Sequence, residues 1–520
     1  MPLRLLPPGM TPVRLRAAQR RFAAILGADR VFFDELDRET YSDQFAISPD
    51  SHVPIGAVAP ESVEEIRAIV AVANAYKLPL WPISRGKNLG YGGSAPVLSG
   101  SVVLDLSRMK KIEVDRENGV VLVEPGVSFY DLHDYLQTND IPLWLSVPGN
   151  SWGSVAGNAL DRGVGYTTYG DHTSKICGLE VVLPDGDLVR TGMGAMANAP
   201  TWQLYRYGYG PAWDQLFVQS NFGIVTKLGL WLMPRPESMM GLELNFDKPE
   251  DLEWAVDILA GLRREGLLQQ APSIGNWLRA AAVLTKREDW HDQPGALPDS
   301  VIAAIRRKFQ LGWWGTSVRV YGRESVNRAA ISAIKSAFKG HRLMSMERTH
   351  WVDGEPLERS AWVGAPITFP MQNVGWHGGR GGHIGFSPVL PANGRLAMEQ
   401  FRQTYARYKE FGMDYQASFA MGERHLTNVN AILFNQDDPA MMARIHPFFR
   451  TLVADAKARG YAEYRAHIEH MDLVAETYDF NNHALRRLNE RVKDALDPNG
   501  VIAPGKSGIW PARLRTRRRR

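Results

Sequence analysis

The chain has 520 residues, a length that favours roughly two to four domains and is also compatible with two large ones. Apolar residues make up 44% and charged residues 22%, which is typical of a globular protein and excludes a disordered or fibrous one. The net charge is +4, and the last nine residues, 512–520, contribute much of it. Such a basic end favours a solvated tail, with contact to nucleic acid or anionic lipid as the alternative. Because the rest of the chain is close to neutral, we do not expect nucleic acid as a partner.

Cys177 is the only cysteine. One thiol excludes an intrachain disulfide framework, a cysteine-based zinc site and an iron–sulfur cluster, and we expect no metal. Prolines interrupt the N-terminal segment where a signal peptide would need an apolar core, and no apolar run approaches about 18 residues. These features predict a soluble cytoplasmic protein with no membrane segment.

Strands and helices alternate at short spacing through the first part of the chain. A helix is expected over 61–76 because Val63, Ile66, Ile69, Val70 and Ala73 share one face, and Pro60-Glu61-Ser62 supplies a start signal. Short apolar strands are expected within 78–84, 100–107 and 119–127, and a helix over 128–137. This alternation indicates an α+β or α/β fold. An Asp-Gly turn divides the strand-like segment 177–192, and 220–234 closes this part.

A second α+β domain is expected beyond residues 235–238. Amphipathic helices are predicted in 251–268, 300–310, 328–339 and 395–411, with a strand at 316–322 between them. The final segment, 485–510, again contains glycine-rich loops like those of the first part. We therefore expect the chain to return to its first domain.

Two glycine-rich stretches raise the question of a ligand. In Pro82–Gly93, "PISRGKNLGYGG", backbone N–H groups could converge on a phosphate, although a simple tight turn competes. This stretch is neither a Walker loop nor a Rossmann fingerprint. The second stretch, Gly375–Pro388, "GWHGGRGGHIGFSP", holds six glycines. Three interpretations compete: a phosphate-binding loop, a flexible loop, or a backbone without side chains that leaves space around His383.

The segment "SRGKNLGYGG" resembles the diphosphate loop of the vanillyl-alcohol oxidase and p-cresol methylhydroxylase flavoprotein family. Six further segments match that family in order along nearly the whole chain, and they are most similar to its bacterial eugenol oxidase branch: 152–172, 178–195, 219–229, 381–388, 463–467 and 496–510.

This resemblance implies an α+β fold with a two-subdomain FAD-binding domain and an inserted α+β substrate (cap) domain. The FAD-binding domain would comprise residues 1–236 and 463–520, and the cap domain 237–462. The resemblance also implies these FAD contacts: Gly86, Lys87, Asn88, Leu89, Gly90, Gly92, Gly93, Gly153, Ser154, Asn158, Gly165, Ile224, Arg465 and Lys506.

His383 matches the histidine that family members bond covalently to the 8α carbon of the flavin, and His377 is a weaker candidate. We interpret the glycines around His383 as clearance for the flavin ring. Tyr91, Tyr464 and Arg465 match the groups that hold the phenol oxygen of the substrate. Two hydroxyl donors and a fixed positive charge would favour the phenolate.

The sequence departs from the family beside the flavin. Gly149 occupies the place of an aspartate, and Ser151 replaces a glycine. Ser418 stands where relatives often have a larger or acidic side chain, and Ala420 is also small. We expect these four residues to line a substrate pocket with room for bulky substituents, such as two methoxy groups or an extended side chain. Arg380 could enter this pocket, although a surface position is favoured.

The leading hypothesis is an oxidase of para-substituted phenols that passes electrons to molecular oxygen and releases hydrogen peroxide. A dehydrogenase of the same fold that reduces a cytochrome or another carrier is the first alternative. A flavin-binding protein that has lost this chemistry is the second, suggested by Gly149. The resemblance also implies a homodimer or larger homo-oligomer.

Overall fold

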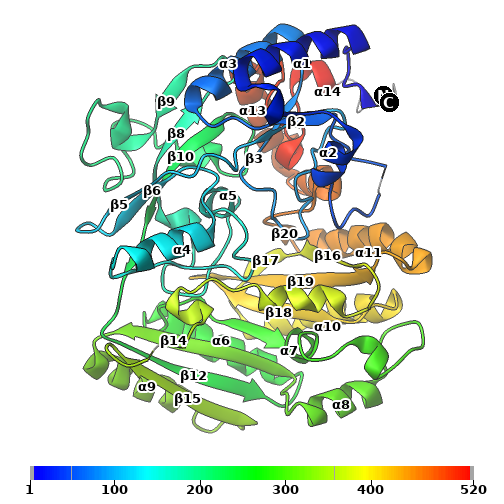
Figure 1. Cartoon of the computed structure of the whole chain (residues 1–520). Coiled ribbons are helices and arrows are strands. Elements are labelled where there is room, and N and C mark those ends of the chain that lie inside the picture. The colour runs from blue at the N-terminus through cyan, green and yellow to red at the C-terminus, as the bar shows by residue number, and fades with distance from the viewer. Residues whose placement is uncertain (1–4, 49, 357, 516–520) are drawn as a thin grey trace.

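The computed structural model describes residues 5–48, 50–356 and 358–515, and Figure 1 shows them as two halves, one above the other. The upper half combines segments from both ends of the chain, and the lower half is built on one large sheet. The end of the arginine tail, residues 516–520, lies outside the described residues. Within the described ranges, no helix is long and apolar enough to cross a membrane.

The first sheet of the upper half has the strand order β1-β2-β4-β3, and its last three strands are parallel. The helix predicted over 61–76 is confirmed as α3, which begins after Ser62, whose Oγ accepts the Glu65 N–H at 3.2 Å. Helix α1 packs with α3 against this sheet. The elements are β1 (Val31–Phe32), β2 (Gly56–Val58), β3 (Leu80–Ile83), β4 (Val102–Asp105), α1 (Pro12–Leu26), α2 (Glu35–Thr40) and α3 (Val63–Tyr76).

The second sheet of the upper half is antiparallel, in the order β5-β6-β10-β8-β9. The predicted Asp-Gly turn joins β8 to β9, where the Leu183 N–H donates to the Asp187 carbonyl oxygen at 2.8 Å. Helix α4 begins with a capping box between Ser128 and Asp131. The elements are β5 (Ile112–Asp115), β6 (Val120–Val123), α4 (Phe129–Thr138), α5 (Val155–Leu160), β8 (Ile176–Val182), β9 (Leu188–Arg190) and β10 (Ile224–Trp231).

The C-terminal segment packs back on the first sheet, as expected. Leu80 of β3 forms a parallel bridge to Ile502, and Val501 and Ile502 are fully buried in the same core as α1 and α3. Figure 1 shows the red C-terminal helices among the blue N-terminal elements. These helices are α12 (Met471–Ala475), α13 (Phe480–Leu496) and α14 (Ala512–Arg515).

The lower half contains nine strands among the described residues, in the order β15-β12-β14-β13-β18-β19-β17-β20, with β16 also paired to β19. Four helices, α6, α9, α10 and α11, bury their apolar faces against one side of this sheet. The strands are β12 (Ser238–Phe246), β13 (Ser273–Asn276), β14 (Trp314–Gly322), β15 (Ser345–Val352), β16 (Gly381–Phe386), β17 (Pro388–Pro391), β18 (Gln416–Met421), β19 (His425–Asn435) and β20 (Ala462–Glu463).

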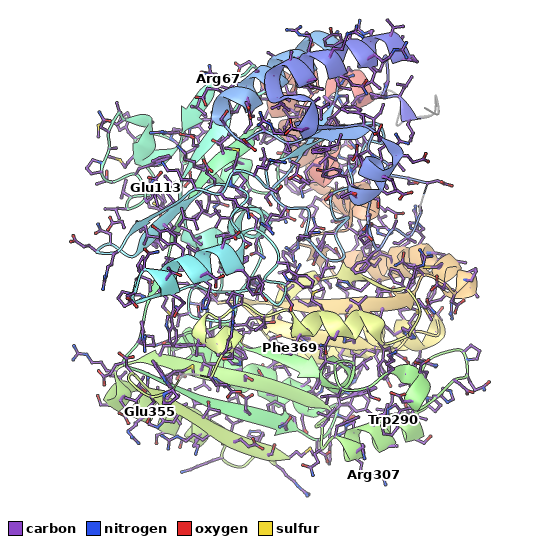
Figure 2. All side chains as sticks on the ribbon, viewed as in Figure 1. Arg67, Glu113, Trp290, Arg307, Glu355 and Phe369 are labelled. Atoms are coloured by element: carbon purple, nitrogen blue, oxygen red, sulfur yellow. The ribbon has the colours of Figure 1, made fainter. Side chains whose placement is uncertain are left out.

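The helices of the lower half are α6 (Asp251–Arg264), α7 (Trp277–Ala281), α8 (Asp299–Lys308), α9 (Glu324–Ala337), α10 (Gly394–Glu410) and α11 (Pro439–Ala458). A small ladder of β7 (Leu143–Trp144) and β11 (Met233–Pro234) lies near the connection between the halves. The short helix η8 (Phe369–Gly375) precedes the strand that carries His383. Phe369 is labelled in Figure 2 where the upper and lower halves meet.

Candidate active site

A cavity of about 1430 Å³ lies between the two halves. Loops of the first two sheets form its upper wall. The face of the third sheet opposite α6, α9, α10 and α11 forms its lower wall. This volume exceeds the roughly 300–1,000 Å³ of ordinary small-molecule pockets, so the cavity can hold a large cofactor together with a substrate.

The loop after β3 forms one end of the cavity. Gly86, with φ +63°, leaves no space for a side chain, because a β-carbon there would overlap Ser94. The Asn88 side chain closes the loop: its Nδ2 donates to Gly93 O at 3.0 Å, and its Oδ1 accepts the Gly93 N–H at 2.8 Å. Lys87 and Leu89 line the cavity beside them. The result is a tight, cationic turn suited to phosphate.

Two glycines of this loop that were predicted as FAD contacts, Gly90 and Gly92, have close neighbours within the protein. A β-carbon at Gly90 would lie 2.8 Å from His383 Cε1, and one at Gly92 would lie 2.6 Å from Ile468. These glycines therefore allow the loop to pack closely against its neighbours within the protein.

The segment around α5 supplies another wall. Gly153, Ser154, Asn158 and Gly165 all line the cavity, and Ser154 Oγ caps α5 by accepting the Gly157 N–H at 2.9 Å. Asn158 Oδ1 accepts a 2.6 Å hydrogen bond from His172 Nδ1. Burial lowers the pKa of His172 to about 4, so its ring is neutral near pH 7.

A half-buried ion pair joins this wall to the C-terminal segment. Lys506 Nζ lies 3.1 Å from Asp161 Oδ1, and Arg465 Nη1 donates to Asp161 O at 3.3 Å. Burial alone would raise the pKa of Asp161, but the attraction of Lys506 and Arg465 outweighs it and lowers that pKa. Lys506 and Ile224, which were predicted as FAD contacts, also line the cavity. Sequence reasoning missed Asp161, because only the fold brings it to Lys506.

His383 projects from β16 into the cavity. Its Nδ1 has no hydrogen-bond partner among the described residues, and its ring meets that of Phe45 edge-on, with 5.7 Å between the ring centroids. Burial, reinforced by the nearby His467, lowers the pKa of His383 to about 4. Near neutral pH its imidazole is therefore uncharged and has a free nitrogen electron pair or N–H for a ligand.

The interpretation of the neighbouring glycines as clearance for a ring needs correction. A β-carbon at Gly381 would overlap the carbonyl oxygen of Val374, and one at Gly382 would overlap the ring of Phe434. These glycines thus allow close packing of the protein on itself. Arg380 is at the surface, as favoured, where it pairs with Asp437 at 2.7 Å. His377 is half-buried and is not among the described residues that line the cavity.

Tyr91, Tyr464 and Arg465 converge although more than 370 residues separate the first from the other two. The Arg465 guanidinium carbon lies 4.0 Å from the centroid of the Tyr91 ring, and Arg465 Nη2 donates to the Tyr464 hydroxyl at 3.3 Å. All three line the cavity, and Arg465 Nε has no partner in the described part of the chain. Burial raises the pKa of Tyr464, so its hydroxyl stays protonated.

Three of the four predicted pocket residues, Gly149, Ser418 and Ala420, line the cavity. A β-carbon at Gly149 would lie 3.1 Å from the Tyr166 hydroxyl, so the space a side chain would fill faces Tyr166. Ser151 needs correction because it is fully buried behind the wall. Its hydroxyl donates to Pro148 O at 3.1 Å and accepts the Ile367 N–H at 3.0 Å, and both bonds turn it away from the cavity.

Comparison with known proteins identifies the cofactor class. A family model described as an FAD binding domain matches residues 54–192. The flavoprotein subunit of 4-cresol dehydrogenase (hydroxylating) from Pseudomonas putida is 36% identical over 516 residues, which cover 97% of this chain and 98% of that protein. The chain belongs to the vanillyl-alcohol oxidase and p-cresol methylhydroxylase flavoprotein family.

Solved structures of two similar flavoproteins share the whole architecture. The 4-ethylphenol oxidase from Gulosibacter chungangensis has a TM-score of 0.93 and 36% identity, covering 98% of this chain and 100% of that one. The p-cresol methylhydroxylase structure has a TM-score of 0.92 and 34% identity, covering 97% and 99%. The expected α+β fold with an FAD-binding domain is confirmed.

The residues of the cavity fit FAD. The glycine turn at Gly86–Gly93 and Lys87 suit a diphosphate. Three buried polar atoms of cavity-lining residues have no partner among the described residues: His383 Nδ1, Arg465 Nε and Asn221 Oδ1. Because buried polar groups are normally paired, these atoms indicate a polar ligand that completes the site.

Proposed function

We propose that this flavoprotein oxidises para-substituted phenols. The observation that carries the proposal is the convergence of Tyr91, Tyr464 and Arg465 in one cavity with the FAD-binding loops. The names of the similar proteins, a 4-cresol dehydrogenase and a 4-ethylphenol oxidase, point to the same substrate class.

In this proposal the three residues bind the phenol oxygen. The hydroxyls of Tyr91 and Tyr464 donate hydrogen bonds to it, and Arg465 supplies a positive charge that cannot be lost at working pH. An adjacent positive charge lowers the pKa of an acid by roughly 1–3 units, so the substrate is held as its phenolate. Negative charge on the phenol oxygen raises the electron density of the ring and weakens the C–H bonds of the para side chain.

FAD, when bound, would supply a two-electron acceptor for a hydride from the side-chain carbon attached at the para position, and loss of that hydride from the phenolate would leave a quinone methide. Gly149 has no carboxylate that could act as a base for water adding to the quinone methide. The polar atom nearest to where its side chain would begin is the Tyr166 hydroxyl. Asp161 holds Lys506 through its carboxylate and Arg465 through its backbone carbonyl, so both positive charges lie at the cavity wall. There they would stabilise the negative charge of a reduced flavin.

We propose His383 as the covalent attachment point of the flavin. Its neutral, unpartnered imidazole faces the cavity from β16, and that state is the one able to act as a nucleophile. Among family members a histidine tether accompanies oxidases, which favours oxygen as electron acceptor with hydrogen peroxide as product. A dehydrogenase that reduces a protein carrier is the alternative, favoured by the 4-cresol dehydrogenase relative. Peroxide release in aerated buffer without added acceptor distinguishes the two.

The same proposal assigns residues 1–236 and 463–520 to FAD binding and 237–462 to the cap domain. It also includes a homodimer or larger homo-oligomer, which sedimentation of the holoprotein tests.

Substitution of Tyr464 by Phe tests the phenol site. Loss of one hydrogen bond to a charged oxygen, about 1.5–3 kcal/mol, would slow anaerobic flavin reduction by a para-substituted phenol about 10- to 100-fold. The matched control is Tyr478→Phe, because the Tyr478 hydroxyl donates to Glu463 O and does not line the cavity. Equal rates in the two variants would contradict the assigned role.

A further inference from the structure

The floor of the cavity is a trough of small residues that crosses the centre of the third sheet. In one row of neighbouring strands, Gly315 pairs with Gly275 and Gly275 with Ser418. In the adjacent row, Ser273 pairs with Ala420. All of these residues line the cavity, as does Ser317 beside them, and we call these six residues the trough. Neighbouring strands lie about 4.8 Å apart, so the three strands of the trough span about 10 Å of small residues, which leaves room for a para side chain beside a phenol ring.

Arg279 of α7 lies along the trough. A β-carbon at Gly275 would lie 2.9 Å from Arg279 Cδ, so the absence of a side chain at Gly275 makes room for the arginine. Arg279 Nη1 reaches Ser273 Oγ at 3.5 Å, the long limit for a hydrogen bond. Arg279 is exposed at the cavity wall and makes no ion pair in the described ranges. Its guanidinium donors are thus available to a ligand.

The other charges around the trough are largely matched. Glu243, at its β12 end, is bound by Arg319 and by the Ser317 hydroxyl. Arg263 is attracted by Glu423 and donates from Nη1 to two backbone carbonyls, those of Leu268 and Gln269.

Farther along the cavity wall, Lys175 faces Asp171. Arg424 is exposed, and among the described residues its Nη1 donates to one backbone carbonyl, that of Glu423. With Arg279, this end of the cavity therefore has an excess of positive charge, which attracts anions.

We propose that the trough receives the para side chain of a phenol and that Arg279 binds a carboxylate at the end of that side chain. This proposal rests on the proposed function, which places the phenol oxygen at Arg465. A guanidinium binds a carboxylate through two parallel hydrogen bonds, and the Ser273 hydroxyl can add a third. The substrate class is a 4-hydroxyphenyl alkanoate or alkenoate, with one anionic group at each end.

Calorimetric titration of the holoprotein with 4-hydroxyphenyl alkanoates of two to five methylene groups, and with their primary amides, tests the proposal. At one chain length the acid should bind about tenfold more tightly than the amide, and added salt should reduce that difference. Arg279→Gln should reduce the preference to less than about twofold. Arg264→Gln, a change to an exposed arginine of α6 outside the cavity, should retain it.

Equal binding of acid and amide at every length, or a preference unchanged by Arg279→Gln, would overturn the proposal. Anaerobic mixing with the same pairs separates this inference from the proposed function. Flavin reduction without a preference for acids refutes the role of the trough alone. A preference for acids that depends on Arg279, without flavin reduction, supports the trough and refutes phenol oxidation.

Discussion

Gly90→Ala should prevent covalent attachment of the flavin without unfolding the protein. The new β-carbon would lie 2.8 Å from His383 Cε1, 3.0 Å from Nε2 and 3.0 Å from the His383 carbonyl oxygen. That carbonyl belongs to β16, which is paired along its length with β19 and cannot withdraw easily. The imidazole must therefore turn, and Phe45 packs edge-on against the same ring.

The magnitude has two parts. Gly90 has φ +78°, where alanine costs roughly 1–2 kcal/mol. Turning the His383 ring from its rotamer costs roughly 0.5–1.5 kcal/mol more. The total of roughly 1.5–3.5 kcal/mol leaves the fold intact, whereas a 1 Å misplacement of a reacting group slows a reaction about 100-fold.

Gly266→Ala is the matched control. Gly266 has the same φ of +78°, and a β-carbon there would meet nothing within 4 Å, so the variant has the backbone strain without the contact to His383. The assay is the fraction of yellow flavin that stays with acid-precipitated protein. Gly266→Ala should match the unmodified protein, and Gly90→Ala should release its flavin. Full retention of flavin by folded Gly90→Ala would refute this reasoning.

Three further variants test the substrate pocket, the buried ion pair of the core and the pKa of His377. Ser418→Phe should fill the trough and lower kcat/KM for a 4-alkylphenol with an extended para side chain relative to 4-hydroxybenzyl alcohol about tenfold; an unchanged ratio would contradict the pocket assignment. Lys493→Met should cost about 3–5 kcal/mol in urea unfolding, because it leaves Asp497 buried without its 2.8 Å partner, whereas the exposed Lys457→Met should cost under about 1 kcal/mol. Burial lowers the pKa of His377 from 6.5 to about 4. As the pH falls from 6.5 to 4, the unfolded chain therefore binds a proton at this histidine before the folded chain does, and the free energy of unfolding should decrease. His377→Asn should flatten that fall by about 1.4 kcal/mol per pH unit, and an unchanged slope would contradict it.

Local sequence signals were sufficient for individual elements of the fold. The helix Val63–Tyr76 follows from its apolar spacing and its Ser62 cap, and the β8–β9 hairpin from its Asp-Gly turn. In these cases the residues that determine the element are neighbours in the chain. The return of the C-terminal segment was predicted from its glycine loops, and the Leu80–Ile502 bridge agrees with it.

The resemblance brought Tyr91 and Tyr464 into one hypothesis, because no local pattern relates residues so far apart. What the sequence could not reveal is what each glycine contacts. Gly90, which was assigned to the diphosphate, lies against His383, and Gly382 lies against Phe434. Close packing and ligand clearance both require glycine, and only the fold distinguishes them. No sequence pattern indicated a role for Arg279 either. Its side chain lies over Gly275 because α7 directly follows β13 and folds back over that strand.

Anaerobic mixing of the holoprotein with 4-hydroxybenzyl alcohol tests the central claim most directly. Oxidation of the phenol must reduce the flavin, so the absorption of the oxidised flavin should disappear in a single turnover. Admitting air should restore it with release of hydrogen peroxide if oxygen is the acceptor. A flavin that dithionite reduces but that no para-substituted phenol bleaches would contradict the account.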